Sequence, residues 1–382
     1  MLTIPARYGP ELVAALAAAL AGGPAVLPLP SGVEGDRLRA ALRPDEPVPD
    51  DVALIVPTSG STGDPKGVEL TAAALEASAV ATEARLGGPG RWLLALPVTH
   101  IAGLQVVLRA LRAGSLPVAI PDPPPDPAAV GGPGRSAGFA ARFAAGTAAL
   151  GPGRRFTSLV PTQLRRLLDA GPAALDALRS YDAVLLGGAA PPPGLVAQAT
   201  TAGVRVIVTY GMSETCGGCV YDGVPLDGVT VDLADDDRIG IGGPVLASRY
   251  RLRPRLTRAA FRAGRFRTGD VGRLDDGHLT VLGRADDMLV TGGEKVAPAA
   301  VEAALGEHPA VAEAAVTGVA DPEWGQRVVA VVVLHEGGTL TLEQAREQVA
   351  ARVSRIAAPR ELRVVDALPL LPSGKLDRAA LR

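Results

Sequence analysis

Short apolar runs alternate with amphipathic stretches up to about residue 245. Apolar runs of four or five residues predict buried strands, and these lie at 52–56, 92–96, 157–160, 183–186 and 205–209. Helical patterns separate them. Thr71 is a typical N-cap residue, and the helix that it begins should run to about Arg85. Such alternation is typical of an α/β architecture with largely parallel sheets and helices.

The pattern changes after about residue 246. Segments rich in Arg and Gly then predict short antiparallel strands at 249–252, 271–274 and 279–282. The rest of the chain predicts a compact α+β unit of about 95 residues, the size of a small domain. We therefore expect an N-terminal domain over 1–285, which includes a small β subdomain, and a small mobile C-terminal domain over 286–382. The hinge between them is expected near Asp286.

The composition is that of a globular, enzyme-like protein. Of the 382 residues, 47% are hydrophobic and 20% are charged, with a net charge of −2. This near-neutral charge and 3% aromatic residues argue against a nucleic-acid partner, which calls for basic patches and stacking rings. No apolar run reaches the ~20 residues that span a bilayer, and no targeting segment is visible. A cytoplasmic protein is expected.

Two cysteines, Cys216 and Cys219, stand in a C-x-x-C spacing. A redox pair would need a thioredoxin-like βαβ context, and a zinc site would need two further ligands nearby. Neither is visible, because the four histidines are scattered along the chain. The spacing alone therefore does not indicate redox or metal chemistry.

Residues 58–67 are the most distinctive stretch of the sequence. Glycines let several backbone N–H groups face one concavity, hydroxyls add donors and lysine adds a mobile charge, so the stretch suits a polyphosphate. The residues expected to bind it are Thr58, Ser59, Gly60, Ser61, Thr62, Gly63 and Lys66. This is not a Walker A motif, because Pro65 precedes the lysine and a strand at 67–70 follows. We expect a flexible flap over the phosphates, and the alternative is an ordinary polar loop.

Lysine is rare in this chain, since all but three of the 38 Lys and Arg residues are arginines. The three are Lys66, Lys295 and Lys375, and each stands beside or close to glycines. Lysine offers a compact charge with three rotatable donors, which a planar guanidinium cannot copy. We infer that at least two of the three contact a phosphate or a developing charge.

Five stretches in order carry a resemblance to a known family. They lie at 58–67, 210–215 (Tyr-Gly-Met-Ser-Glu-Thr), 267–270 (Arg-Thr-Gly-Asp), 283–287 with 292–294, and 372–375 (Pro-Ser-Gly-Lys). Together they resemble the acyl-adenylate-forming superfamily of acyl-CoA ligases, luciferases and peptide-synthetase adenylation domains, over nearly the whole chain. The resemblance implies an AMP-forming acid–CoA ligase that first makes an acyl-adenylate and pyrophosphate from ATP and then transfers the acyl group to CoA.

The resemblance also implies ATP, Mg²⁺ and coenzyme A as cofactors or co-substrates, and roles for single residues. Lys375 would supply positive charge at the α-phosphate in the first step, and Lys66 would bind phosphate. Glu214 would ligate Mg²⁺ as a hard oxygen donor, and Thr215 would bond the α-phosphate. Asp270 would accept ribose hydroxyls. The other nucleotide-site residues would be Gly188, Ala189, Tyr210, Gly211, Met212 and Arg284, with Gly292 and Gly293 presented in the second step.

A finer resemblance concerns the acid. The reduced N-terminal part and the segments 96–105 and 210–219 are most similar to o-succinylbenzoate–CoA ligases of menaquinone biosynthesis. The second carboxylate of such an acid needs a polar anchor, because a buried unpaired charge is costly. The candidate substrate-binding residues are His100, Gln105, Thr162 and Gly211. His100 could instead cap a helix, and Thr99 stands where relatives often have an aromatic residue.

Other functions remain open from the sequence. The chain could activate another aromatic or medium-chain acid, load a carrier protein, or serve as a non-catalytic nucleotide-binding regulator on the same fold. The chain ends shortly after Lys375, which counts against carrier loading, and the presence of Lys375, Glu214 and Asp270 counts against a regulator. The oligomeric state is open, a homodimer included.

Overall fold

The computed structural model describes residues 1–59, 65–120, 134–369, 376–378 and 380–381. Five residues that the sequence analysis singled out lie outside these ranges: Gly60, Ser61, Thr62, Gly63 and Lys375. The middle of the predicted flap, residues 60–64, therefore lies outside the described residues, whereas both of its ends are described. None of the described helices combines the length and the apolar character of a membrane-spanning segment.

The first sheet joins the N-terminus to a strand far along the chain. Its strands, in spatial order, are β1 (Leu2–Pro5), β2 (Val26–Leu29), β3 (Val52–Ser59), β4 (Pro65–Thr71) and β14 (Arg249–Tyr250). The first three are parallel, whereas β4 is antiparallel to both β3 and β14. Helices α1 (Pro10–Leu20) and α2 (Val33–Leu42) connect the parallel strands.

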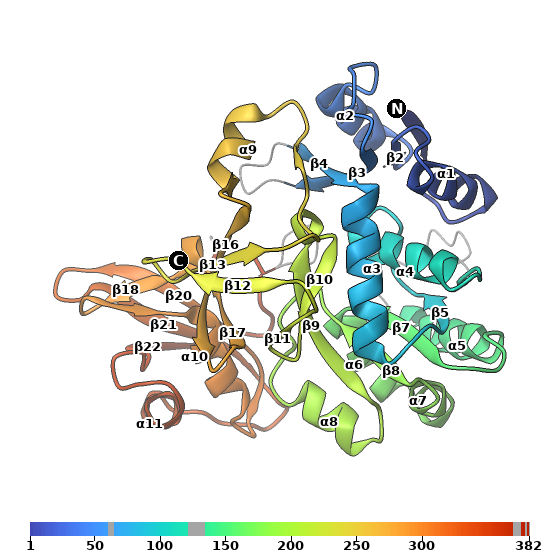
Figure 1. Cartoon of the computed structure of the whole chain (residues 1–382). Coiled ribbons are helices and arrows are strands. Elements are labelled where there is room, and N and C mark those ends of the chain that lie inside the picture. The colour runs from blue at the N-terminus through green and yellow to red at the C-terminus, as the bar shows by residue number, and fades with distance from the viewer. Residues whose placement is uncertain (60–64, 121–133, 370–375, 379, 382) are drawn as a thin grey trace.

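The second sheet has seven strands in the order β11-β10-β9-β8-β7-β5-β6. Its parallel strands are β5 (Arg91–Leu94), β6 (Val118–Ala119), β7 (Arg155–Leu159), β8 (Ala183–Leu186) and β9 (Val206–Met212). Antiparallel strands β10 (Gly217–Tyr221) and β11 (Val224–Pro225) continue it beyond β9. Six helices accompany the sheet: α3 (Ala72–Leu86), α4 (Ile101–Arg112), α5 (Gly134–Ala148), α6 (Pro161–Asp169), α7 (Pro172–Arg179) and α8 (Leu195–Thr201). Helix α3 packs on α4 and β10 (Figure 1).

The third sheet is antiparallel and follows the second along the chain. Its order is β12 (Thr230–Leu233), β13 (Arg238–Gly242), β16 (Arg265–Asp275) and β15 (Phe261–Arg262), and β17 (His278–Arg284) also pairs with β16. Helix α9 (Pro254–Ala260) lies between β14 and β15 in sequence. Two short 3₁₀ turns, η1 (Ser213–Thr215) and η2 (Ala285–Asp287), follow β9 and β17 respectively.

The fourth sheet belongs to the C-terminal region. It comprises β19 (Glu294–Val296), β18 (Leu289–Thr291), β21 (Gly325–Leu334) and β20 (Val311–Asp321), with β22 (Glu361–Val364) parallel to β21. Helices α10 (Pro298–Gly306) and α11 (Leu342–Arg352) pack against each other, and α10 also packs on β20. The region buries its own apolar cluster, which includes Val301, Val316 and Val328. Figure 1 shows these orange and red segments to the left of the view, away from α1 and α2.

The predicted α/β fold class is confirmed, with a large N-terminal region of mainly parallel sheets, an antiparallel subdomain and a smaller α+β C-terminal region. The expected strand at 52–56 lies inside β3, and the expected helix from Thr71 is α3. Thr71 caps it as predicted, because its hydroxyl oxygen accepts a hydrogen bond from the Ala74 N–H at 3.1 Å. The boundary at residue 285 and the mobility of the C-terminal region stay predictions.

Several elements were missed from the sequence, among them β1 and the helices α2, α5, α7 and α9. Helix α2 contains Gly35 and lies in a segment that reads as a Pro-rich connection. The glycine is needed there, because a Cβ at this position would overlap the Pro30 carbonyl group. Antiparallel pairing also occurs before the predicted change near residue 246, between β3 and β4 and between β9 and β10.

Candidate active site

The segments that follow β5, β7, β8 and β9 lie along one edge of the second sheet, because these four strands are parallel neighbours. The predicted site residues on these segments, or at the end of β9 itself, are His100, Thr162, Gly188, Ala189, Gly211 and Met212. Ligands in open parallel sheets bind beyond the carboxyl ends of the strands. The fold thus brings these segments together at the edge of the sheet where a ligand is expected to bind.

A compact polar cluster joins this edge to the first sheet. Lys66, on β4, donates from Nζ to Glu214 Oε1 at 2.9 Å and to the Tyr250 hydroxyl oxygen at 3.1 Å. The Tyr250 hydroxyl in turn donates to the same Glu214 oxygen at 2.7 Å. Glu214 is 6% exposed, so its charge depends on these partners. The structure therefore pairs two predicted site residues that lie far apart in the sequence.

Local hydrogen bonds hold the turn that carries Glu214. The Thr215 hydroxyl accepts from the Met212 N–H at 2.9 Å and lies 2.7 Å from the Gly217 carbonyl oxygen, to which it donates. Thr215 is completely buried. Its hydroxyl therefore shapes η1, and the predicted bond to the α-phosphate would require it to leave this turn.

A second polar cluster joins the end of β9 to the third sheet. Asp270 and Arg284 face each other in the β16–β17 register, and Arg284 contacts Asp270 Oδ1 at 3.2 Å. The Tyr210 hydroxyl donates to Asp270 Oδ2 at 2.7 Å. Burial, and then the negative charge of Asp270, raises the pKa of Tyr210, so this hydroxyl stays a donor. The predicted partners Asp270, Arg284 and Tyr210 are thus brought together.

At two of the predicted nucleotide-site positions, the backbone geometry explains why the residue is glycine. Gly188, which follows β8, has a φ of +81°, a left-handed conformation that favours glycine. Gly211 lies so close to β10 that a Cβ would overlap the backbone of Gly217. The neighbouring Ala189 is exposed beyond the end of β8. These positions let the backbone, rather than side chains, form this part of the edge.

The residues proposed for the acid differ in burial. Gln105, on α4, is 1% exposed and donates from Nε2 to the Cys216 carbonyl oxygen at 2.8 Å. Its Oε1 is buried without a hydrogen-bond partner among the described residues. His100 is exposed at the N-cap position of α4 but makes no side-chain capping bond, and Thr162 is exposed at the start of α6. Gln105 is therefore held behind the turn that follows β9.

Among the described residues, the predicted C-terminal site residues Gly292 and Gly293 lie in a turn of the fourth sheet. Gly292 and Gly293 form the turn between β18 and β19, with φ values of +58° and +83°. The nearby Lys295 pairs with Asp237 at 3.2 Å, at the β12–β13 turn. The inference that at least two lysines contact phosphate stays a prediction, since the contacts described for Lys66 and Lys295 are to protein groups.

The two cysteines are buried and unpaired by a disulfide. Burial raises the pKa of Cys219 to about 12 and raises that of Cys216 as well. A reactive cysteine needs an accessible thiolate, so neither environment is that of a redox centre.

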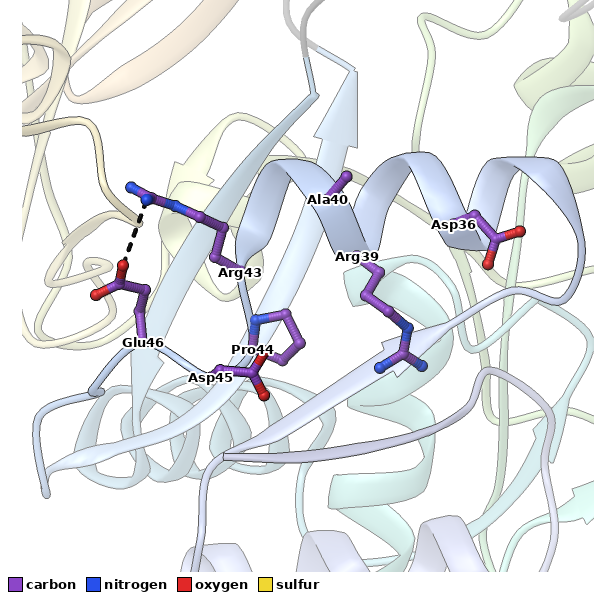
Figure 2. A pocket seen from close by; sticks show the side chains of 7 residues that line it. All are labelled: Asp36, Arg39, Ala40, Arg43, Pro44, Asp45 and Glu46. Atoms are coloured by element: carbon purple, nitrogen blue, oxygen red, sulfur yellow. Dashed lines mark ion pairs between the residues drawn. The ribbon is translucent and has the colours of Figure 1, made fainter.

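A surface pocket of about 530 Å³ lies away from both clusters. It is lined by residues of α2 and the loop after it: Asp36, Arg39, Ala40, Arg43, Pro44, Asp45 and Glu46 (Figure 2). Arg43 and Glu46 form an ion pair at 3.3 Å at its rim. None of the described site residues lines this pocket, so we do not assign it to the reaction.

The carboxylate of Glu214 suits a magnesium ion that arrives with the phosphate groups of a ligand. Among the described residues, no three His, Cys, Asp or Glu side chains are grouped to hold a metal by themselves. Magnesium is usually held by one or two carboxylates, and substrate phosphates and water complete its shell. Glu214 offers such a carboxylate, because both of its described hydrogen bonds go to Oε1 and no described donor contacts Oε2.

Tyr250 is the main site residue that sequence reasoning missed. It lies 36 residues beyond Glu214, in a segment predicted only as a short strand. The one available signal was scarcity, because tyrosine occurs only five times in the chain. Its contacts depend on the pairing of β14 with β4, which the sequence pattern does not predict.

Comparison with known families identifies the class. A model of the AMP-binding enzyme family matches residues 31–264, and a model of the AMP-binding enzyme C-terminal domain matches residues 300–375. The first match alone covers more than half of the chain. The protein belongs to the AMP-binding enzyme family, and the resemblance seen in the sequence is confirmed.

Individual relatives narrow the comparison. A probable 2-succinylbenzoate–CoA ligase of Mycobacterium tuberculosis is 50% identical, over 97% of this chain and 94% of the relative. A sulfoacetate–CoA ligase of Cupriavidus necator is 34% identical, over 88% of this chain and 67% of the relative. Among solved structures, the o-succinylbenzoate CoA synthetase of Bacillus subtilis in complex with its acyl-adenylate intermediate has a TM-score of 0.72 and 28% identity. That match covers 97% of this chain and 80% of that one.

Proposed function

We propose that this chain is an AMP-forming ligase that joins o-succinylbenzoate to coenzyme A in menaquinone biosynthesis. The observation that carries this proposal is the 50% identity, nearly end to end, with a probable 2-succinylbenzoate–CoA ligase. In the first step a carboxylate oxygen of the acid attacks the α-phosphorus of ATP, and pyrophosphate leaves. In the second step the thiol of CoA attacks the acyl carbon of the adenylate, and AMP leaves.

The Lys66–Glu214 pair supports the proposal that the phosphates of ATP bind beside β4 and η1. Lys66 would exchange Glu214 for a phosphate oxygen when ATP binds, because both are anionic acceptors within reach of the same ammonium group. Glu214 would then ligate Mg²⁺ through its free oxygen. Bound magnesium would neutralise phosphate charge during displacement.

The cluster of Asp270, Arg284 and Tyr210 supports the proposal that the nucleoside binds there. Each carboxylate oxygen of Asp270 has one described partner, Arg284 or Tyr210, and keeps a second lone pair for a ribose hydroxyl. Tyr210 would place its ring beside the adenine, with Gly188 and Ala189 on the other side. The hydrogen bond to Asp270 would fix that ring.

The acids of the two named relatives share a feature that supports a polar acid pocket. Both o-succinylbenzoate and sulfoacetate carry a second acidic group besides the carboxylate that is activated. Burying that group without a partner would be costly. His100, Gln105 and Thr162, with the backbone of Gly211, are the groups that we propose to meet it. Gln105 would do so through the second N–H of its Nε2 group, because the first is donated to the Cys216 carbonyl oxygen.

The C-terminal region is proposed to act as a mobile domain with a hinge near Asp286. It would carry Lys375 to the α-phosphate for adenylation. It would then rotate, so that Gly292 and Gly293 face the site while CoA enters. Asp286 lies 3.8 Å from the Arg284 guanidinium, which links the proposed hinge to the Asp270 cluster.

A panel of acids tests the proposal. The panel would contain o-succinylbenzoate, sulfoacetate, benzoate and a medium-chain fatty acid, each assayed for ATP–pyrophosphate exchange and for CoA thioester formation. We expect the highest kcat/KM with o-succinylbenzoate. A preference for another acid would reassign the substrate. The absence of exchange with every acid would contradict a ligase and favour a nucleotide-binding regulator.

A further inference from the structure

The segment from Ala247 to Arg251 bridges the two halves of the phosphate site. Tyr250 pairs with Val68 in the β14–β4 ladder, and the Arg251 N–H donates to the Gly67 carbonyl oxygen at 2.8 Å. The segment is thereby fixed to the strand that carries Lys66. At its other end, the Ala247 N–H donates to the Glu214 carbonyl oxygen at 2.8 Å.

The side chain of Tyr250 completes this bridge. Its hydroxyl donates to Glu214 Oε1 at 2.7 Å and accepts from Lys66 Nζ at 3.1 Å, so its single proton is committed to the carboxylate. The Lys66 ammonium also lies 4.2 Å from the centre of the tyrosine ring, within cation–π range. Tyr250 is 3% exposed, so solvent does not readily replace these contacts.

Two different groups hold Glu214 Oε1, and only one of them can leave. Lys66 stands on a long flexible side chain next to the residues expected to bind phosphate. Tyr250 is held by the β14–β4 ladder and by the packing of its ring against Phe261, with the ring centres 5.6 Å apart. When Lys66 turns to a phosphate, Tyr250 still donates to Oε1, and the carboxylate keeps its orientation.

We propose that Tyr250 is a positioning residue for metal-bound nucleotide: it holds Glu214 Oε1 so that Oε2 faces the magnesium ion of ATP. The inference rests on the proposed function, because it concerns how that site holds its metal. The proposal also explains how Lys66 stays near the site. The Tyr250 hydroxyl and ring hold its ammonium group whether or not that group contacts Glu214.

The test compares Tyr250→Phe with Tyr181→Phe. Tyr181 is a matched control, because it too has a buried hydroxyl, 2.7 Å from the Thr147 hydroxyl, but belongs to a different apolar cluster from Tyr250. The probe is Mn²⁺ in place of Mg²⁺, with ATP present and no acid, so that no reaction occurs. The electron paramagnetic resonance signal of free Mn²⁺ reports how much metal is bound.

We expect Tyr250→Phe to weaken Mn²⁺ binding in the presence of ATP about 10- to 100-fold, as the loss of a hydrogen bond to a charged group predicts. Binding of ATP in the presence of EDTA, measured by calorimetry, should change less than threefold. Tyr181→Phe should alter neither quantity. Thermal unfolding of both variants shows whether each is folded before binding is compared.

Two results would overturn the inference. One is Mn²⁺ binding by Tyr250→Phe equal to that of the natural chain. The other is an equal loss of metal-free and metal-bound ATP, which would indicate general damage to the site. A Tyr250→Phe variant that does not fold is replaced by Tyr250→His, which also lacks the phenol hydroxyl, in the same two binding measurements. Failure of the natural chain to exchange pyrophosphate with any acid would instead count against the proposed function alone.

Discussion

Replacing Arg251 with methionine should lower the free energy of unfolding by about 3–5 kcal/mol. Arg251 is 2% exposed, and its guanidinium donates to Glu69 Oε1 at 3.2 Å. It also donates to four carbonyl oxygens at the end of α2 and in the loop after it, those of Leu42, Arg43, Glu46 and Pro47. Methionine has a similar length but no donor, so the variant leaves a buried carboxylate and these carbonyl groups without their partner.

The size of the expected loss in free energy of unfolding follows from the burial of Arg251 and Glu69. Removing one partner of a buried ion pair leaves an uncompensated charge, which costs about 3–5 kcal/mol out of a total stability of about 5–15 kcal/mol. Arg249 contacts the other oxygen of the same carboxylate at 3.2 Å, but its side chain is 46% exposed. That contact lacks hydrogen-bond geometry, since Glu69 Oε2 has no hydrogen-bond partner among the described residues. Arg249→Met should therefore cost less than about 1 kcal/mol.

Urea unfolding followed by circular dichroism measures both variants. The slope against urea should be unchanged while the midpoint falls, as expected when stability rather than exposed surface changes. The urea midpoint of Arg251→Lys should lie between those of Arg251→Met and Arg249→Met. Lysine keeps the charge but lacks the planar fork of donors. Equal midpoints for Arg251→Met and Arg249→Met would refute the argument, since burial would then not decide which arginine matters.

Three further predictions concern the reaction and its pH dependence. Lys375→Ala should largely abolish pyrophosphate exchange but spare thioester formation from supplied acyl-adenylate, because charge is needed at phosphorus and not at the acyl carbon. Equal loss of both steps would count against the two-state domain picture. His100→Ala should raise the KM for o-succinylbenzoate more than that for ATP in steady-state assays, and an unchanged acid KM would remove His100 from the pocket. Burial raises the pKa of Tyr210 and Tyr250 above the usual value of 10.0. Above about pH 10 the unfolded chain therefore loses these protons first, so stability should fall as pH rises further. Urea midpoints that fall no less steeply between pH 9 and 11.5 for Tyr210→Phe than for the natural chain would show that this hydroxyl does not contribute.

Much of the fold was readable because its signals are local. Apolar runs of strand length, the Thr71 cap and the order of the five motifs all lie within short windows of sequence, where periodicity and capping chemistry act. The missed helix α2 shows the limit of local signals. Its Gly35 disfavours a helix locally, and only the close approach of Pro30 explains it.

Local patterns along the chain predicted the α/β class, and five motifs in order carried the resemblance to the family. Which of the predicted site residues contact one another depends instead on how distant elements pack. Lys66, Glu214 and Tyr250 meet through the pairing of β14 with β4, and Thr215 is turned inward by its own turn. Pairing between distant strands leaves no periodic trace in the sequence, since it is set by how separate elements pack.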